Sequence, residues 1–446
     1  MTLAIRRLAR TMLAVGIAFV GMVALTVPAS AAATDNWPAY LGGPAHNSYA
    51  AGQATITPAN ASTIKQKWHD PGGVLASPTV VGGYVYIGTD LGYFEKIKGT
   101  TGVIVAKMFL GLEPKKTCSK QGIVSTATVT GGIAYVASPD GYLYALNTTD
   151  LSVLWKSVIA IPSGTASDYF NWSSPTVSHG RIYVGISSHC DNPLVRGGEE
   201  SFSQTTGAHL ATFFTVPSGS RGGSIWSSAA VDSLGNVYVT TGNASGTVNS
   251  QYTESIVKLS PSLKPIASWT IPAADQTPDA DFGGSPTLFG NDVGACNKDG
   301  IYYAVNASTM TLDWKRQLGG PDTAVAECIA AAAYDGQDLF VAGEAITING
   351  TAYAGSVQEL TPSGSLVWQT GLPNGVDTSP SVDGGGVVAA GTFDMTATPN
   401  ATYLFNASTG KILKTMAPGL DDFGQSTWAN GMLFLANESG VSGWGP

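Results

Sequence analysis

The stretch "SPTVVGGYVYIGTDLGYFEKIKGTTG" (77–102) sets a pattern that returns along the chain. It combines a short apolar strand, a Gly turn, an alternating strand of the Val-Tyr-Val type and a third strand that ends in a Thr/Gly turn. A fourth strand often carries Trp, as in "LDWKRQ" (312–317). The echoes of the stretch are "TATVTGGIAYVASPDGYLYALNTTD" (126–150), "SPTVSHGRIYVGISS" (174–188), "SAAVDSLGNVYVTTGN" (228–243) and "SPSVDGGGVVAAGTF" (379–393). Strands that repeat with a pitch of roughly fifty residues are typical of β-propeller blades.

Counting the repeats predicts the number of blades. First strands begin near Leu75, Ile123, Asn171, Gly223, Phe282, Glu327, Val376 and Phe423. The last unit ends at "VSGWGP" without a fourth strand, whereas "IKQKWHDP" (64–71) is a fourth strand that lacks its own first three. If the early strand completes the last blade, two sheet edges disappear. We therefore predict an all-β fold, an eight-bladed β-propeller of four-stranded antiparallel blades, closed by an N-terminal strand, over residues 32–446.

The first 31 residues are predicted to be a secretory signal peptide. A basic start (Arg6, Arg7 and Arg10) is followed by an apolar run and by a small-residue cleavage signal that ends at Ala31. No second long apolar run follows, so we expect a secreted chain without a membrane span. Cleavage removes three arginines and no acids, which takes the net charge from −9 to −12. Such an acidic chain lacks the basic surface that nucleic acids need.

Four cysteines remain in the exported chain: Cys118, Cys190, Cys296 and Cys328. An even count in an oxidising compartment favours two disulfides, with three connectivities open in principle. The cysteines lie at starts of first strands and after second strands, so all four are expected on one face. Adjacency of the second blade with the third, and of the fifth with the sixth, favours Cys118–Cys190 and Cys296–Cys328.

A spacing of seventeen residues selects the candidate site. In a propeller the first strand of each blade lines the axis, so its start meets the end of the second strand about seventeen residues later. Trp226 and Asn243 have this spacing, as do Asp281 and Lys298, and Asp191 ends the second strand of the third blade. Carboxylate and amide oxygens suit a hard cation such as calcium. A Trp face offers a stacking platform, and Lys offers a point charge for a carbonyl oxygen.

From "NWPAYLGGPAHNSY" (36–49) to the last blade, the chain resembles the pyrroloquinoline quinone (PQQ)-dependent alcohol dehydrogenases, especially the polyvinyl alcohol dehydrogenase-like branch. The resemblance implies that Trp226 is the floor under the quinone and that Lys298 hydrogen-bonds its oxygens. It implies that Asn243 and Asp281 bind calcium, with Asp281 also the general base on the alcohol. Asp191 falls near a Glu that binds calcium in the family, one residue displaced and one methylene shorter.

Three features separate the chain from its relatives. The family's adjacent Cys-Cys pair over the quinone is missing, and no Cys-x-x-Cys-His motif for a c-type haem occurs. Gly283 stands where relatives that use lanthanides carry a second acid, so the resemblance implies calcium. His189 lies beside the proposed metal, but a lone loop His is more often structural, and we do not count it as catalytic.

The expected function is that of an exported quinoprotein dehydrogenase. It would oxidise a small or polymeric alcohol or a polyol with PQQ and calcium, and pass electrons to a separate acceptor. The alternative is a non-catalytic propeller that serves as an extracellular binding or assembly scaffold.

Overall fold

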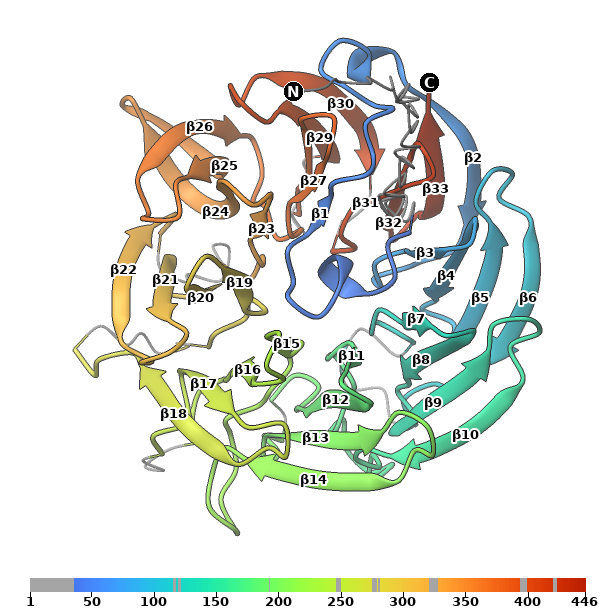
Figure 1. The fold of residues 1–446 in the computed structure, drawn as a ribbon, viewed down its shortest axis with the longest axis vertical. Helices are drawn as coiled ribbons and strands as arrows, with labels where there is room; N and C mark the ends of the chain where they lie inside the picture. The colour runs from blue at the N-terminus through green and yellow to red at the C-terminus, as the bar shows by residue number, and fades with distance from the viewer. Residues whose placement is uncertain are drawn as a thin grey trace, which may run out of the picture. The chain divides into compact units, whose positions relative to one another are not determined.

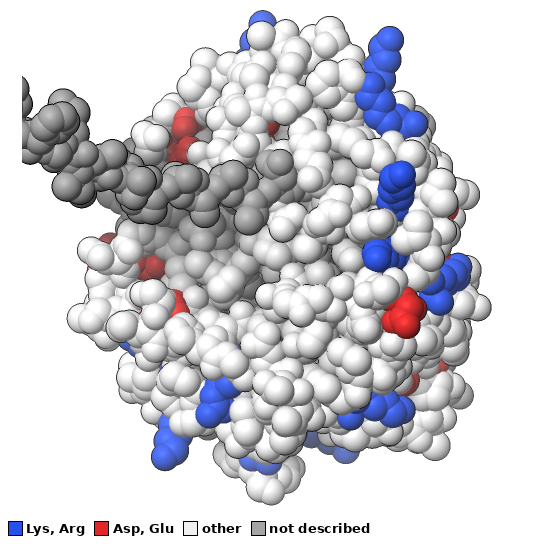
Figure 2. Space-filling model, turned by 45° about the vertical axis from the view of Figure 1, so that its right-hand side comes forward, with Lys and Arg blue, Asp and Glu red and all other residues white. Residues whose placement is uncertain are grey.

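The computed structural model describes residues 36–114, 118, 122–191, 193–245, 250–274, 279, 281–320, 328–393, 399–419 and 423–446. The predicted signal peptide and the predicted start of the sixth blade at Glu327 lie outside these residues. No helix among the described residues is long and apolar enough to cross a membrane. Figure 2 shows Lys and Arg as separate groups among uncharged side chains, without a continuous basic surface on this face.

Residues 36–446 form eight sheets arranged in a ring, as predicted (Figure 1). The innermost strand of each blade is short: β3 (Thr79–Val81), β7 (Thr128–Thr130), β11 (Thr176–Ser178), β15 (Ala230–Val231), β19 (Thr287–Phe289), β23 (Ala333–Tyr334), β27 (Ser381–Asp383) and β31 (Thr427–Ala429). The second strands are β4 (Tyr84–Gly88), β8 (Ile133–Ala137), β12 (Arg181–Ile186), β16 (Val237–Thr240), β20 (Asp292–Cys296), β24 (Leu339–Ile348), β28 (Val387–Gly391) and β32 (Met432–Asn437).

The outer half of each blade follows in the same order. The third strands are β5 (Tyr93–Lys98), β9 (Tyr142–Asn147), β13 (Gly198–Ser203), β17 (Ser255–Leu259), β21 (Ile301–Asn306), β25 (Thr351–Leu360), β29 (Asn400–Asn406) and β33 (Gly440–Gly445). The fourth strands are β6 (Ile104–Phe109), β10 (Val153–Val158), β14 (His209–Phe214), β18 (Pro265–Thr270), β22 (Leu312–Gln317), β26 (Leu366–Leu372), β30 (Ile412–Gly419) and β2 (Lys65–Pro71). Second strands are buried on both faces by neighbouring blades, whereas fourth strands alternate in exposure.

The ring closes as the sequence predicts. β2 pairs antiparallel with β33, with Trp68 opposite Gly443, so the early strand completes the blade built from residues 423–446. The indole of Trp68 is nearly buried, donates a hydrogen bond from Nε1 to the Gly99 carbonyl at 2.7 Å, and lies 6.1 Å from the ring of Phe434. The last blade therefore combines one early strand with the last three strands of the chain.

The segment 36–50 has a role that the repeat pattern does not reveal. It runs across the centre of the ring (Figure 1) and includes the short 3-10 helix η1 (Tyr40–Gly42) and the strand β1 (Tyr49–Ala50). A second 3-10 helix, η2 (Ala61–Thr63), precedes β2. Backbone N–H groups of Val80, Val129, Val231, Leu288, Tyr334 and Val382, from six different blades, donate to carbonyls of this segment at 2.7–3.1 Å. β1 also pairs parallel with β27, which gives that blade a fifth strand instead of the expected four.

The repeated Ser-Pro-Thr motif links each blade to the next. The first hydroxyl of the motif accepts a backbone N–H from the preceding blade at 2.8–2.9 Å, which holds for Ser77, Thr126, Ser174, Ser228, Ser285 and Ser379. The Thr two positions later donates to a carbonyl of the next blade, as Thr79 does to Ala127 at 2.6 Å. Buried backbone groups at the axis have no pairing strand on that side, so these hydroxyls satisfy them.

Both predicted disulfides are confirmed: Cys118–Cys190 and Cys296–Cys328, with no free cysteine among the described residues. Each bridge joins neighbouring blades, and the second spans 32 residues of chain. We expect Cys296→Ala together with Cys328→Ala to lower the free energy of unfolding by about 4 kcal/mol, because the unfolded chain regains the entropy of an open loop. Guanidinium unfolding measures this, and an unchanged midpoint would contradict the expectation.

Candidate functional site

Loops of the third, fourth and fifth blades bring the predicted site residues together. Trp226 precedes β15 and Asn243 follows β16, and the Gly223 N–H donates to the Asn243 carbonyl at 2.7 Å. Asp281 precedes β19 and Lys298 follows β20, and the Lys298 N–H donates to the Asp281 carbonyl at 3.0 Å. The seventeen-residue spacing therefore corresponds to a direct backbone contact between Asp281 and Lys298.

Asp281 is the buried acid of the cluster, with 6% of its surface exposed. Its Oδ1 accepts a short hydrogen bond from the backbone N–H of Asn243, and Gly242 leaves room for the carboxylate, since a Cβ there would lie 2.8 Å from Oδ1. Burial raises the pKa of Asp281 to about 6, against the opposing effect of Lys298. A carboxylate with this pKa can hold or release a proton near neutral pH.

Asp279 is a member of the cluster that the sequence prediction omitted. Its carboxylate lies 2.9 Å from Lys298 Nζ and accepts a hydrogen bond from Asn243 Nδ2 at 3.3 Å. Asp279 therefore contacts both Lys298, which the resemblance assigns to the quinone, and Asn243, which it assigns to the metal. The sequence "PDADFGG" contains both Asp279 and Asp281. Only Asp281 lies seventeen residues before Lys298, so the spacing did not select Asp279.

Asp191 lies in the left-handed region of backbone conformation, with a φ of 55°. Desolvation raises the pKa of its carboxyl and the nearby Asp279 adds to this, while Ser188 and Lys298 act in the opposite direction. The charges of Asp279 and Lys298 therefore link Asp191 to the cluster. No three His, Cys, Asp or Glu side chains converge on a metal position within the described part of the chain.

Trp226 belongs to a ring of residues that lie two positions before the first residue of each blade motif, which is Ser or Thr in six blades. The ring consists of Leu75, Val124, Trp172, Trp226, Gly283, Ile329, Asp377 and Phe423, and with the hydroxyls and Tyr40 it lines an axial cavity of about 170 Å³. A Cβ at Gly283 would lie 2.8 Å from the Trp226 ring and 2.4 Å from the Ile329 side chain. An acidic side chain at position 283 would therefore displace Trp226. Lys298 Nζ lies 5.6 Å from the centre of the Trp226 ring.

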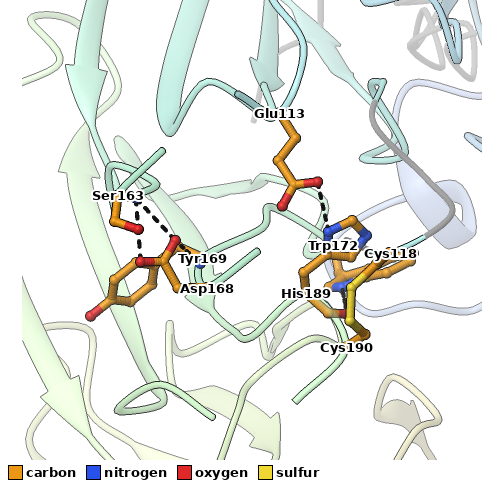
Figure 3. Close-up of polar contacts among 8 residues, drawn as sticks. All are labelled: Glu113, Cys118, Ser163, Asp168, Tyr169, Trp172, His189 and Cys190. Carbon is orange, nitrogen blue, oxygen red and sulfur yellow. Dashed lines mark hydrogen bonds and ion pairs between the residues drawn. A yellow bond between two sulfur atoms is a disulfide. The ribbon is translucent and has the colours of Figure 1, made fainter. Parts of the chain in front are cut away.

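A buried contact between His189 and Glu113 lies beside this cluster, and Figure 3 shows it. His189 Nδ1 is 2.9 Å from Glu113 Oε2, and both side chains are almost completely buried. The His189 ring stacks on Phe170 at 4.1 Å, and Trp172 Nε1 donates to the His189 carbonyl at 3.2 Å. His189 is therefore packed into the protein interior on the loop that precedes Asp191.

Trp172 and His189 are also seventeen residues apart, so the same spacing rule could have found their contact. Glu113 comes from another blade and carried no signal in the sequence. The disulfide between Cys118 and Cys190 fastens the same loop one residue before Asp191 (Figure 3).

Eight blades, seven with four strands and one with five, around an axial cluster of Trp, Lys and oxygen-bearing side chains define a β-propeller of the PQQ-repeat class. The chain belongs to the PQQ_2 family, described as outer membrane protein assembly factor BamB, whose model matches residues 35–190 and 200–440. No curated protein sequence matches the chain. The polyvinyl alcohol dehydrogenase-like branch stays a prediction.

Solved structures share the fold at low sequence identity. The chain is similar to the quinohemoprotein alcohol dehydrogenase from Comamonas testosteroni, with a TM-score of 0.72, 15% identity, and coverage of 93% of this chain and 81% of that chain. A europium-containing methanol dehydrogenase gives a TM-score of 0.71 and 17% identity over 92% of this chain and 90% of that chain. BamB from Moraxella catarrhalis gives 0.58 and 15% over 86% and 100%, respectively.

Proposed function

We propose that the protein is a PQQ-dependent dehydrogenase that oxidises an alcohol or polyol and passes the electrons to a separate acceptor. The observation that carries this proposal is the grouping of Asp281, Asn243, Lys298 and Trp226 on one face, where Asp281 contacts Asn243 and Lys298 lies over Trp226. The alcohol dehydrogenase and the methanol dehydrogenase that share this fold support the proposed type of reaction.

The residues fit the proposed groups in chemistry and charge. Asp191, Asp279 and Asp281 surround a single Lys298, so the cluster has an excess of negative charge that a hard cation would balance. Asn243 and Asp281, with Asp191, would hold calcium. Lys298, in exchange for its ion pair with Asp279, would hold quinone oxygens above the Trp226 ring. When bound, the quinone supplies the two-electron oxidation of the alcohol carbon.

Asp281 is the residue we assign to proton transfer. Its carboxylate would take the hydroxyl proton of the alcohol, and its raised pKa places it near the range in which a general base works at neutral pH. The bond from the Asn243 N–H fixes one carboxylate oxygen and leaves the other for the substrate and the metal. The test is reduction of an artificial dye by the mature chain supplied with PQQ, calcium and a panel of alcohols; a chain that binds PQQ without any turnover would contradict the assigned chemistry.

The second candidate is a non-catalytic scaffold. It is favoured by the description of the matching family and by the lack of convergence of acidic side chains on one metal position in the described residues. A scaffold has no need of PQQ, so quinone binding separates the two candidates.

The raised pKa of Asp281 predicts opposite pH dependences for the free and the calcium-bound protein. Without calcium, protonated Asp281 contributes fully to the stability of the folded chain below pH 3.8. This contribution is lost as the pH rises through about 6, so the free protein becomes less stable toward neutral pH. The loss is about 3 kcal/mol for a shift of this size. Calcium binds the ionised carboxylate, so its stabilising effect should be large at about pH 7 and small at about pH 5.

Thermal unfolding at the two pH values, with and without calcium, measures both effects. Asp281→Asn is the control. It should remove this pH dependence both from the stability of the free protein and from the stabilisation by calcium. A calcium effect that is the same at both pH values, or that survives in Asp281→Asn, would contradict the assignment of Asp281 as a ligand.

A further inference from the structure

A second cavity opens at the boundary of the third and fourth blades. It has a volume of about 380 Å³ and is lined by residues 193–196, by the turn 219–221, and by Asp168 and Tyr169. Arg196 and Arg221 both line it. Residues 32–446 contain four arginines in all, so half of the guanidinium groups of an acidic chain meet at one cavity.

Both arginines keep their charge available. Arg196 Nε donates to the Val216 carbonyl at 3.0 Å and its guanidinium lies 3.7 Å from the centre of the Phe214 ring, which fixes its orientation. The backbone of Arg196 pairs with that of Gly222, next to Arg221. Across the described ranges, no carboxylate forms an ion pair with either arginine.

The acid that shares the cavity does not neutralise them. Burial acts to raise the pKa of Asp168, but backbone N–H groups of Ser163 and Tyr169, both at 3.0 Å, outweigh it and lower that pKa. Figure 3 shows the Asp168 carboxylate turned toward Ser163. Its oxygens therefore accept hydrogen bonds from the loop that carries it, and the two arginines outnumber the one carboxylate, which leaves the cavity with a net positive charge.

The position of this cavity connects it to the candidate active site. The Ser245 N–H donates to the Arg221 carbonyl at 3.3 Å, and the next residues, Gly222 and Gly223, pair with Ala244 and Asn243. One short stretch of backbone, 243–245, therefore contacts both the Asp281 carboxylate and the Arg221 carbonyl.

We infer that this cavity binds the oxyanion group of the substrate, a carboxylate, sulfate or phosphate, so that the preferred substrates are anionic alcohols such as hydroxy acids. Arginine guanidinium groups bind such oxyanions through paired N–H donors, which explains why arginine rather than lysine occupies both positions. The inference about substrate class rests on the proposed dehydrogenase function, whereas the anion site itself does not.

The first experiment is calorimetric titration of the mature chain with gluconate, without PQQ. We expect saturable binding that sulfate competes with, that glycerol leaves unaffected and that weakens as salt is added. Arg221→Ala and Arg196→Lys should each weaken gluconate binding by about tenfold or more, since a charged hydrogen-bonding group or its paired geometry is lost. Lys264→Ala, in the turn before β18, is the matched control and should leave binding unchanged.

Arg196→Lys keeps the charge and the stem that covers Phe214, so an unchanged thermal transition shows that a loss of binding is not a loss of folding. Absence of gluconate and sulfate binding, or binding by both arginine variants as tight as by the wild-type chain, would overturn the anion site. Binding without dye reduction would reject the proposed function and leave the site intact. Turnover of glycerol and gluconate with equal kcat/KM, unaffected by Arg221→Ala, would retain the function and overturn the substrate class.

Discussion

Asp281→Asn should lower alcohol-dependent dye reduction by about 10²–10⁴-fold and leave quinone binding nearly unchanged. The amide cannot take a proton from the alcohol, and a positioned general base contributes a factor of this size. It keeps an oxygen close to the Asn243 N–H, so the local structure should persist. Steady-state rates with PQQ and calcium, together with a quinone titration of the same variant, measure the two effects separately.

Asp292→Asn is the matched control for this experiment. Burial and the neighbouring Asp313 raise the pKa of Asp292 to about 6, as for Asp281, but Asp292 begins β20, whereas Lys298 follows the end of that strand. It should retain full activity. An active Asp281→Asn enzyme would contradict the assignment of the base, and equal loss in both variants would indicate a general effect of removing a carboxylate with a raised pKa.

Trp68→Ala should lower the free energy of unfolding by about 3–5 kcal/mol, the usual cost of truncating a buried Trp. The indole fills a space left by two glycines, since a Cβ at Gly102 or Gly443 would lie 2.8 or 2.5 Å from it. It also provides the hydrogen bond to the Gly99 carbonyl. Because β2 is the strand that closes the ring, its loss should also expose the edge of β33.

Trp314→Ala is the comparison that isolates ring closure. Trp314 occupies β22, a fourth strand whose blade is continuous in sequence, and it likewise donates to a carbonyl, that of Pro362, at 2.9 Å. Denaturant unfolding should show a loss of stability in both variants, but limited proteolysis should cut between residues 51 and 64 faster only in Trp68→Ala. Equal proteolysis of the two variants would contradict the role of β2 in closing the ring.

The fold was predictable because one pattern recurs and its two ends are incomplete in complementary ways. The orphan strand at 64–71 and the last unit without a fourth strand identify each other, and the structure pairs them. The disulfide pairing was predictable from the order of the blades, because that order decides which cysteines lie on neighbouring blades. The position of the segment 36–50 was not predicted, because its backbone carbonyls make the hydrogen bonds to six blades. Every residue has a backbone carbonyl, so such bonds do not depend on a pattern of side chains.

The candidate site was predictable where two strands of one blade meet. Trp226, Asn243, Asp281 and Lys298 come from two hairpins, and a fixed spacing relates the residues within each. Asp279 and Glu113 were missed for a physical reason: each acts through a contact between different blades, Asp279 with Asn243 and Glu113 with His189. Such contacts depend on how the blades pack, which the repeat alone does not specify.

Calorimetric titration of the mature chain with PQQ, with and without calcium, tests the central claim most directly. We expect saturable binding that is tighter with calcium. Trp226→Ala should weaken binding by about 1–3 kcal/mol, if quinone stacking resembles the stacking of a base on an aromatic ring. Absence of PQQ binding by the wild-type chain at millimolar calcium would contradict the account and leave the scaffold as the function of this propeller.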